Sequence, residues 1–263
     1  MVRPETFLPA ARKAALEAGR YLLQGLSQSK KVSYKGQVDL VTSFDRRSEE
    51  IIYDRLSRAF PGHSFLAEEE IRHDRASDYC WLVDPLDGTT NYAHGLPVFC
   101  VSIALAFKGE IILGVVYDPN RQEIFMAVRG QGANLNGHPI RVSRTRRLDR
   151  SLLATGFPYD VRTSRDNNLD HFSNFAVRAQ AIRRLGSAAL DLCYVACGRF
   201  DGYWEKKLKP WDLAAGVLLV EEAGGRVSDL QGKKFKLPGP HVVASNGHIH
   251  RPMLEILSLG RVK

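Results

Sequence analysis

The stretch WLVDPLDGTTNY, residues 81–92, carries an apolar run directly into two carboxylates. Residues 81–83 are typical of a buried strand, Asp84 ends the run, and Asp87 follows three positions later. An unpaired carboxylate is costly to bury, so a cation is expected beside these two acids. Residues 88–90, Gly-Thr-Thr, stand at an expected helix start and offer backbone N–H groups to an anion such as phosphate.

Further acids stand at the ends of other expected elements. Residues 68–70 are three glutamates that close a short apolar strand, Asp45 follows an apolar stretch, and Asp212 opens the helical sequence WDLAAGV. Carboxylate oxygens without histidine or cysteine suit a hard cation, Mg²⁺ or Mn²⁺. Because this cation site would adjoin the anion site at residues 88–90, the pattern indicates metal-assisted phosphoryl transfer.

Each of these acids also has a simpler structural interpretation. A D-x-x-D pair alone is usually a helix N-cap followed by a solvated acid, and Asp212 alone is most simply an N-cap. Residues 68–70 alone are most simply a solvated run of charge. These explanations are sufficient one at a time, but together they account poorly for acids that recur beside a Gly-Thr-Thr stretch.

Hydrophobic periodicity predicts helices and strands along the whole chain. Helices are predicted over residues 5–26, 43–60, 165–179, 187–198, 211–225 and 250–257. Strands are predicted over residues 63–70, from residue 80 to an end within the motif of residues 84–92, at several places within 99–137, and over 151–157, 181–185, 200–205, 226–232 and 241–247, with a polar loop or hairpin over 27–37. This order favours layered sheets and helices, a mixed α/β fold class.

The length, composition and net charge of the chain limit the classes of protein to which it can belong. With 263 residues, 44% hydrophobic and 25% charged, the sequence suits a globular α/β protein with a large core. We expect a single domain over residues 1–263, with a soft internal boundary near residues 140–150. The net charge of +8 favours anionic partners, although a solvated basic surface is the simpler interpretation. One cluster, RVSRTRRLDR at residues 141–150, holds five arginines against one aspartate.

The four cysteines, Cys80, Cys100, Cys193 and Cys197, form no C-x-x-C pair and lie beside no histidine cluster, so a zinc site is not expected. Free thiols are the expected state. The N-terminus lacks the apolar stretch of a signal peptide, and no window is long and apolar enough for a membrane span. We therefore expect a cytoplasmic protein with no membrane contact.

The motifs, in this order, resemble the inositol monophosphatase family of Mg²⁺-dependent, lithium-sensitive phosphatases. The resemblance rests on VDLVTSFD, FLAEEE, WLVDPLDGTTNY and WDLAAGVLLVEEAGG, and it spans roughly residues 34 to 230. It implies a layered αβαβα sugar-phosphatase fold and hydrolysis of myo-inositol-1-phosphate. It also implies a homodimer, with AIRRLGSAAL at residues 181–190 resembling a segment near the interface.

The resemblance implies roles for individual residues. The metal ligands would be Glu68, Asp84, the carbonyl of Leu86, Asp87 and Asp212, holding two Mg²⁺ ions bridged by Asp84 and a third, weaker ion near Glu68. Two ions about 3.5–4 Å apart can activate a water and stabilise both the attacking and the leaving oxygen. Thr89 and Asp45 would orient and deprotonate that water, and the N–H groups of Gly88 and Thr89 would hold the phosphate.

Substrate hydroxyls would be recognised by Asp87, Gly186, Ser187, Ala188 and Glu205. A carboxylate such as Glu205 suits a vicinal diol because it accepts two hydrogen bonds, although an exposed acid at a strand end is the simpler interpretation. Lys35 lies near the position where the family has a loop lysine, in an unsettled register.

Two sets of alternatives remain open. Within the family, fructose-1,6-bisphosphate, histidinol phosphate and 3′-phosphoadenosine nucleotides are other candidate substrates. In a different class of function, some bacterial relatives act in RNA transcription complexes, and the arginines of residues 141–150 would suit such a role, although no RNA-binding signature is present.

Overall fold

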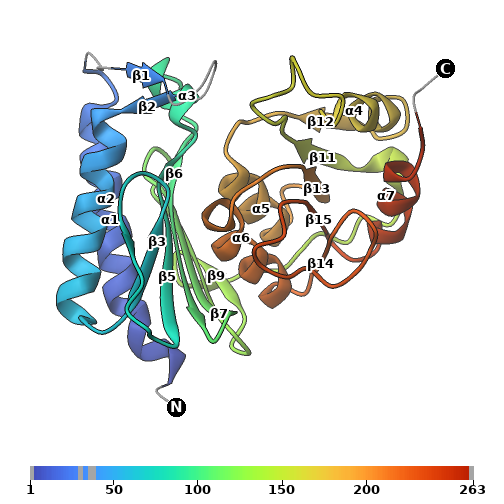
Figure 1. Ribbon diagram of the computed structural model, residues 1–263. Helices are drawn as coiled ribbons and strands as arrows, with labels where there is room; N and C mark the ends of the chain where they lie inside the picture. The colour runs from blue at the N-terminus through green and yellow to red at the C-terminus, as the bar shows by residue number, and fades with distance from the viewer. Residues whose placement is uncertain (1–2, 29–31, 35–39, 261–263) are drawn as a thin grey trace.

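The computed structural model describes residues 3–28, 32–34 and 40–260 of the chain. Its elements form five successive layers: helices, a sheet, helices, a second sheet and helices (Figure 1). A separate hydrophobic core fills each junction between the outer helices and a sheet, and the largest core lies between the two sheets. The expected mixed α/β class and αβαβα order are confirmed.

The first sheet has eight strands in the order β10-β9-β8-β7-β6-β5-β3-β4. All neighbours are antiparallel except β3 and β5, which are parallel. The strands are β3 Ser64–Ala67, β4 Arg72–His73, β5 Tyr79–Asp87, β6 Cys100–Phe107, β7 Glu110–Asp118, β8 Glu123–Val128, β9 Ala133–Leu135 and β10 His138–Pro139. Helices cover both faces of this sheet, which explains why its central strands are apolar without alternation.

Two long helices, α1 (Leu8–Gly25) and α2 (Ser43–Ala59), cover the outer face of this sheet (Figure 1). The predicted helix over residues 5–26 is confirmed, except that its first turn is the 3₁₀ helix η1, Pro4–Phe7. A small two-stranded sheet, β1 (Val32–Tyr34) with β2 (Leu40–Thr42), leads into α2.

The second sheet has five strands in the order β12-β11-β13-β15-β14. They are β11 Leu152–Thr155, β12 Ala181–Arg183, β13 Gly202–Glu205, β14 Arg226–Ser228 and β15 Val242–Ser245. Helices α5 (Ala188–Ala196) and α6 (Pro210–Glu222) lie between the sheets, while α4 (Leu169–Ala176) and α7 (His250–Leu257) cover the outer face (Figure 1). The chain passes from one sheet to the other between Pro139 and Leu152, where a soft boundary is predicted; the number of domains stays a prediction.

One predicted helix is too long at its start. Residues 165–179 were expected to be helical, but α4 begins only at Leu169 because Asn168 adopts the left-handed conformation, with φ 71°. No helix among the described residues combines the length and the apolar character needed to cross a bilayer.

Candidate active site

A β-bulge at the end of β5 places the two aspartates of the opening motif. Asp84 pairs with Ser102 and Asp87 pairs with Cys100, so three steps along β5 match two along β6. Pro85 has no N–H to give the ladder, and its carbonyl instead accepts a 2.7 Å hydrogen bond from the Ser48 hydroxyl of α2. A bulge redirects side chains; here Asp84 is buried, while Asp87 is partly exposed and contacts the start of α5.

The Gly-Thr-Thr stretch begins a helix, as predicted. Gly88, with φ 100°, is the N-cap of α3 (Thr89–Ala93). Besides this left-handed backbone, a Cβ atom at position 88 would lie 2.9 Å from the carbonyl oxygen of Val98. Glycine is therefore required for the chain to turn here directly after Asp87.

The predicted partners Asp45 and Thr89 are in contact. Thr89 donates its hydroxyl hydrogen bond to Asp45 Oδ1 at 2.9 Å, and it also lies 3.0 Å from the carbonyl oxygen of Leu86. Asp45 Oδ2 accepts the backbone N–H and the hydroxyl of Thr42 at 2.8 and 2.5 Å, which closes a capping box at the start of α2. Burial raises the pKa of Asp45, while hydrogen bonds from Thr42 and Thr89 lower it.

Glu49, four residues further along α2, holds the loop that follows Glu68. Its buried carboxylate accepts the backbone N–H groups of Glu69, Glu70 and Ile71 at 2.7–2.8 Å. The N–H of Glu68 donates to the carbonyl of Val83 on β5. Sequence reasoning missed Glu49; the available signal was its helical spacing from Asp45 on the buried face of α2.

Asp87 connects the bulge to the segment predicted to bind substrate. Its Oδ2 accepts the Ser187 hydroxyl at 2.6 Å and the N–H of Ala189 at 2.8 Å. Ser187 is the N-cap of α5, so this predicted substrate-binding residue also begins a helix. Burial raises the pKa of Asp87, against the lowering effect of the bond from Ser187.

Asp212 stands in the first turn of α6, where its carboxylate accepts the N–H of Lys209 at 2.8 Å. Asp212 therefore does cap α6, but the pKa of its carboxyl group indicates other acids nearby. Burial and the nearby charge of Glu68 raise the pKa of Asp212 well above its usual value. Burial, together with the charges of Glu68, Asp87 and Asp212, does the same to the pKa of Asp84. The four predicted carboxylate ligands therefore lie close enough to repel one another.

The donor set fits a divalent cation. In the part of the chain that the structure describes, no lysine or arginine forms an ion pair with Asp84, Asp87 or Asp212. The same described residues contain no group of three or more acidic, histidine or cysteine side chains already arranged around a metal position. Asp87 and Asp212 each accept a neighbouring N–H group through Oδ2, so Oδ1 of each carboxylate can face a cation.

Glu205 ends β13 as a buried acid, not as the exposed one that its position also allowed. Its Oε2 accepts the hydroxyl of Tyr203 at 2.5 Å, and its carboxylate lies so close to Gly156 that a Cβ atom at position 156 would displace it. Burial raises the pKa of Glu205 to about 7. Asp191 of α5 is a second buried acid nearby; burial and Glu205 raise its pKa well above normal.

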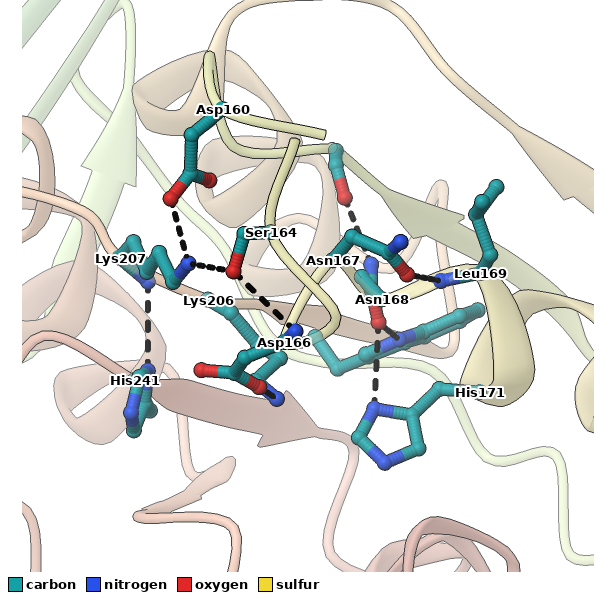
Figure 2. Close-up of polar contacts among 12 residues, drawn as sticks. Asp160, Ser164, Asp166, Asn167, Asn168, Leu169, His171, Lys206, Lys207 and His241 are labelled. Carbon is teal, nitrogen blue, oxygen red and sulfur yellow. Dashed lines mark hydrogen bonds and ion pairs between the residues drawn. The ribbon is translucent and has the colours of Figure 1, made fainter. Parts of the chain in front are cut away.

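Two lysines directly after Glu205 tie the loop of residues 157–168 to the end of β13 (Figure 2). Lys206 pairs with Asp166, and Lys207 Nζ donates to Asp160 at 2.7 Å and to Ser164 at 2.9 Å. The structure brings Thr89 to Asp45 and Asp87 to Ser187, and it places Asp84 and Asp212 near Glu68. Lys35 lies outside the described residues.

Comparison with known proteins shows similarity along almost the whole chain. The model of the inositol monophosphatase family matches residues 3–258. An inositol-1-monophosphatase from Synechocystis is 45% identical, over 97% of this chain and 89% of that protein. The Nus factor SuhB of Pseudomonas aeruginosa is 43% identical, over 95% of each chain. A crystal structure of the extragenic suppressor protein suhB from Bartonella henselae has a TM-score of 0.92 at 42% identity, covering 97% of this chain and 99% of that chain.

A solved inositol monophosphatase from Anabaena has a TM-score of 0.88 at 45% identity, covering 96% of this chain and 95% of that one. A family model that matches nearly the whole chain, together with relatives of this identity, places the chain among the phosphatases. The chain belongs to the inositol monophosphatase family.

Proposed function

We propose that the chain hydrolyses the phosphate monoester of myo-inositol-1-phosphate, with Mg²⁺ as its cation. Family membership makes it a phosphoric monoester hydrolase, and the proposal concerns its substrate, its ions and the roles of its residues. The observation that supports it most is the set of mutually repelling acids beside the Asp45–Thr89 pair.

The residues that would hold the ions are Glu68, Asp84, the carbonyl of Leu86, Asp87 and Asp212. We infer two or three Mg²⁺ ions, replaceable by Mn²⁺, because the donors are all oxygens. When bound, such ions neutralise the phosphate charge and make water a better nucleophile near neutral pH. Lithium inhibition, a property of the family, is proposed for this chain as well.

The chain itself orients the water and receives its proton. Because Thr89 donates to Asp45, a lone pair of the Thr89 hydroxyl can accept a hydrogen bond from the attacking water. The proton passes through Thr89 to Asp45, whose pKa is raised by burial and thus brought closer to that of an effective base. Glu68 would contribute to catalysis by holding the third, weaker ion.

Binding of the substrate falls to two groups of residues. The backbone N–H groups of Gly88 and Thr89, at the start of α3, orient the phosphate. Glu205 accepts hydrogen bonds from hydroxyls of the sugar ring. Residues 186–188, attached to Asp87 through Ser187, complete this wall, so metal ligand and substrate contact are joined in one hydrogen-bonded unit.

The test measures phosphate release from myo-inositol-1-phosphate with and without Mg²⁺, beside Asp87→Asn. We expect Mg²⁺-dependent turnover that the variant loses. Fructose-1,6-bisphosphate, histidinol phosphate and a 3′-phosphoadenosine nucleotide are assayed in parallel. Faster turnover of one of them would replace the proposed substrate, and metal-independent turnover would overturn the proposed chemistry.

A role in transcription is a second candidate. The relative from Pseudomonas aeruginosa is named a Nus factor, and so is one from Salmonella typhimurium at 44% identity. All five arginines of the cluster at residues 141–150 are exposed. We expect a salt-dependent shift of RNA that Arg144→Ala with Arg146→Ala abolishes. Absence of any shift would end this candidate.

We also propose a cytoplasmic homodimer. All four cysteines are free thiols, as expected, which suits a reducing compartment. Large apolar side chains are exposed at Tyr159, Leu169 and Val177, in the segment leading to residues 181–190. Light scattering coupled to size exclusion should give twice the 29.4 kDa chain mass. A monomer at micromolar concentration would contradict the proposed dimer.

A further inference from the structure

Asn168 is a buried residue with an unusual backbone and a fully engaged side chain (Figure 2). Its φ of 71° is left-handed, a conformation that asparagine tolerates better than most residues. Its Nδ2 donates to Thr155 Oγ1 at 3.0 Å and to the carbonyl of Gly156 at 2.6 Å. Its Oδ1 accepts from Trp204 Nε1 at 2.8 Å and lies 3.2 Å from a ring nitrogen of His171.

These bonds are not those of a helix cap. Asn168 occupies the N-cap position of α4, yet its side chain makes no cap hydrogen bond to that helix. It bonds instead to the end of β11 and to β13, the two central parallel strands of the second sheet. A side chain that merely began α4 would bond to the first N–H groups of α4.

Two hydrogen-bond partners of Asn168, Thr155 and Gly156, each contact Glu205 or the residue before it. Gly156 packs directly against the Glu205 carboxylate, so closely that a Cβ atom at position 156 would displace that carboxylate. Thr155 Oγ1 donates at 2.6 Å to the carbonyl of Trp204, the residue before Glu205. The position of the Glu205 carboxylate is therefore fixed by the same backbone segments that Asn168 joins.

The loop before Asn168 is held by the residues after Glu205. Lys206 pairs with Asp166, and Lys207 with Asp160, while the N–H of Lys207 donates to His241 Nδ1 at 3.2 Å (Figure 2). The loop of residues 157–168 therefore bonds to the chain both before Glu205, at Trp204, and after it, at Lys206 and Lys207. This arrangement leaves Asn168 buried and placed between loop and strand before any substrate arrives.

We propose that Asn168 is a positioning residue for Glu205 and thereby sets the preference for phosphate esters of polyols. The inference rests on the proposed function, in which Glu205 binds ring hydroxyls. Asn168 touches neither substrate nor ion; it fixes the Gly156 backbone against which the Glu205 carboxylate is held. A displacement of about 1 Å in such a group is enough to cost a large factor in rate.

The experiment compares kcat and KM for two substrates, myo-inositol-1-phosphate and p-nitrophenyl phosphate, which has no ring hydroxyls. Asn168→Gly removes the side chain without straining the left-handed backbone. Thr155→Val keeps the shape of its side chain but removes the hydroxyl that links Asn168 to Trp204. The matched control is Asn174→Ala, a buried asparagine of α4 whose Nδ2 bonds to the carbonyl of Gly260, away from β11 and β13.

We expect Asn168→Gly to lower the ratio of the two kcat/KM values about tenfold, mainly through KM for the inositol ester. Thr155→Val should lower the same ratio by a smaller factor, and Asn174→Ala should leave it unchanged. A ratio unchanged in folded Asn168→Gly and Thr155→Val, or equally lowered in Asn174→Ala, would overturn the inference alone. No hydrolysis of either substrate by the wild-type chain with Mg²⁺ would overturn both the inference and the proposed function.

Discussion

Acidic side chains occur in two neighbouring regions of the molecule. Among the described residues, only the acids of one region form ion pairs with lysines. In the loop of residues 157–168, Asp160 and Asp166 are half-exposed and each meets a lysine. At the bulge of β5, Asp84 is 2% exposed, and no described lysine or arginine pairs with it. The loop acids serve structure, whereas the bulge acids cost stability until a cation reaches them.

The magnitudes separate the two regions further. An ion pair between partly exposed side chains contributes about 0–1 kcal/mol, so the pair of Lys207 with Asp160 adjusts stability only slightly. Buried carboxylates that raise one another's pKa hold unfavourable charge, and each pKa unit corresponds to about 1.4 kcal/mol. A bound divalent cation would offset the repulsion among these carboxylates. Mg²⁺ should therefore stabilise the bulge region and leave the loop region unchanged.

The largest effect is expected for Asp84→Asn, which removes the proposed bridging ligand. Outer partners of metal ligands alone cost about 10–100-fold when mutated, so turnover should fall by at least about 100-fold. In EDTA at pH 8, the free energy of unfolding should rise, because the variant buries an amide in place of a repelled charge. Steady-state phosphate release and denaturant unfolding measure the two effects.

Asp160→Asn is the control for this prediction. It removes a loop acid that pairs with Lys207, so it should leave the response of stability to Mg²⁺ as in the wild type. A fall in the stability of Asp84→Asn in EDTA would show that Asp84 stabilises the chain without a cation, and the contrast between the regions would then be wrong.

The next effect is expected for Glu49→Gln. An amide cannot accept three N–H groups as a carboxylate does, so the loop after Glu68 should shift and Mg²⁺ affinity should fall about 10–100-fold. Calorimetric titration with Mg²⁺ or Mn²⁺ measures this directly. The neighbouring Glu50→Gln, which removes an exposed pair with Arg47, is the matched control. Equal affinities in the two variants would refute a role for Glu49 in placing Glu68.

Sequence and structure differ mainly where bonds join distant segments. The order of helices and strands, the cap of α2 and the bulge motif follow from local patterns, because periodicity and capping are read within a few residues. Glu49 bonds to N–H groups 20–22 residues away, and Asn168 to strands 12 and 36 residues away. No local pattern specifies such partners.

The same limit applies to the candidate site. The sequence identified Asp87 and Ser187 through separate motifs, but their contact joins residues 100 positions apart. Likewise, the close contact between Gly156 and the Glu205 carboxylate exists only because β11 and β13 are neighbours. Motif resemblance predicts which residues take part, while the hydrogen bonds that hold them require the packed sheets.

Acid should act oppositely on the two halves of the molecule. His250 of α7 is buried between the hydroxyls of Ser228 and Ser245, and burial lowers its pKa to about 4. Since the unfolded histidine binds a proton near pH 6.5, folding stability should fall as the pH drops from 6.5 to 4, by about 2 kcal/mol between pH 7 and 5. The bulge carboxylates, whose pKa values are raised, should gain stability on protonation over the same range.

Denaturant unfolding from pH 7 to 5 in EDTA tests this on two variants. His250→Gln should lose the acid destabilisation, and Asp84→Asn should lose part of the opposing gain. Identical pH slopes for the wild type and His250→Gln would mean that His250 takes up its proton without cost in the folded protein.

The smallest effect is expected for Lys207→Met, which keeps the side-chain stem and the positive φ of 61° but removes the charge that meets Asp160. Both partners are partly exposed, so the free energy of unfolding should fall by less than about 1 kcal/mol. The difference from the wild type should shrink in 1 M salt, because screening weakens exposed pairs. A loss of several kcal/mol that persists in salt would place these loop acids in the same energetic class as the bulge acids and would remove the contrast between the two regions.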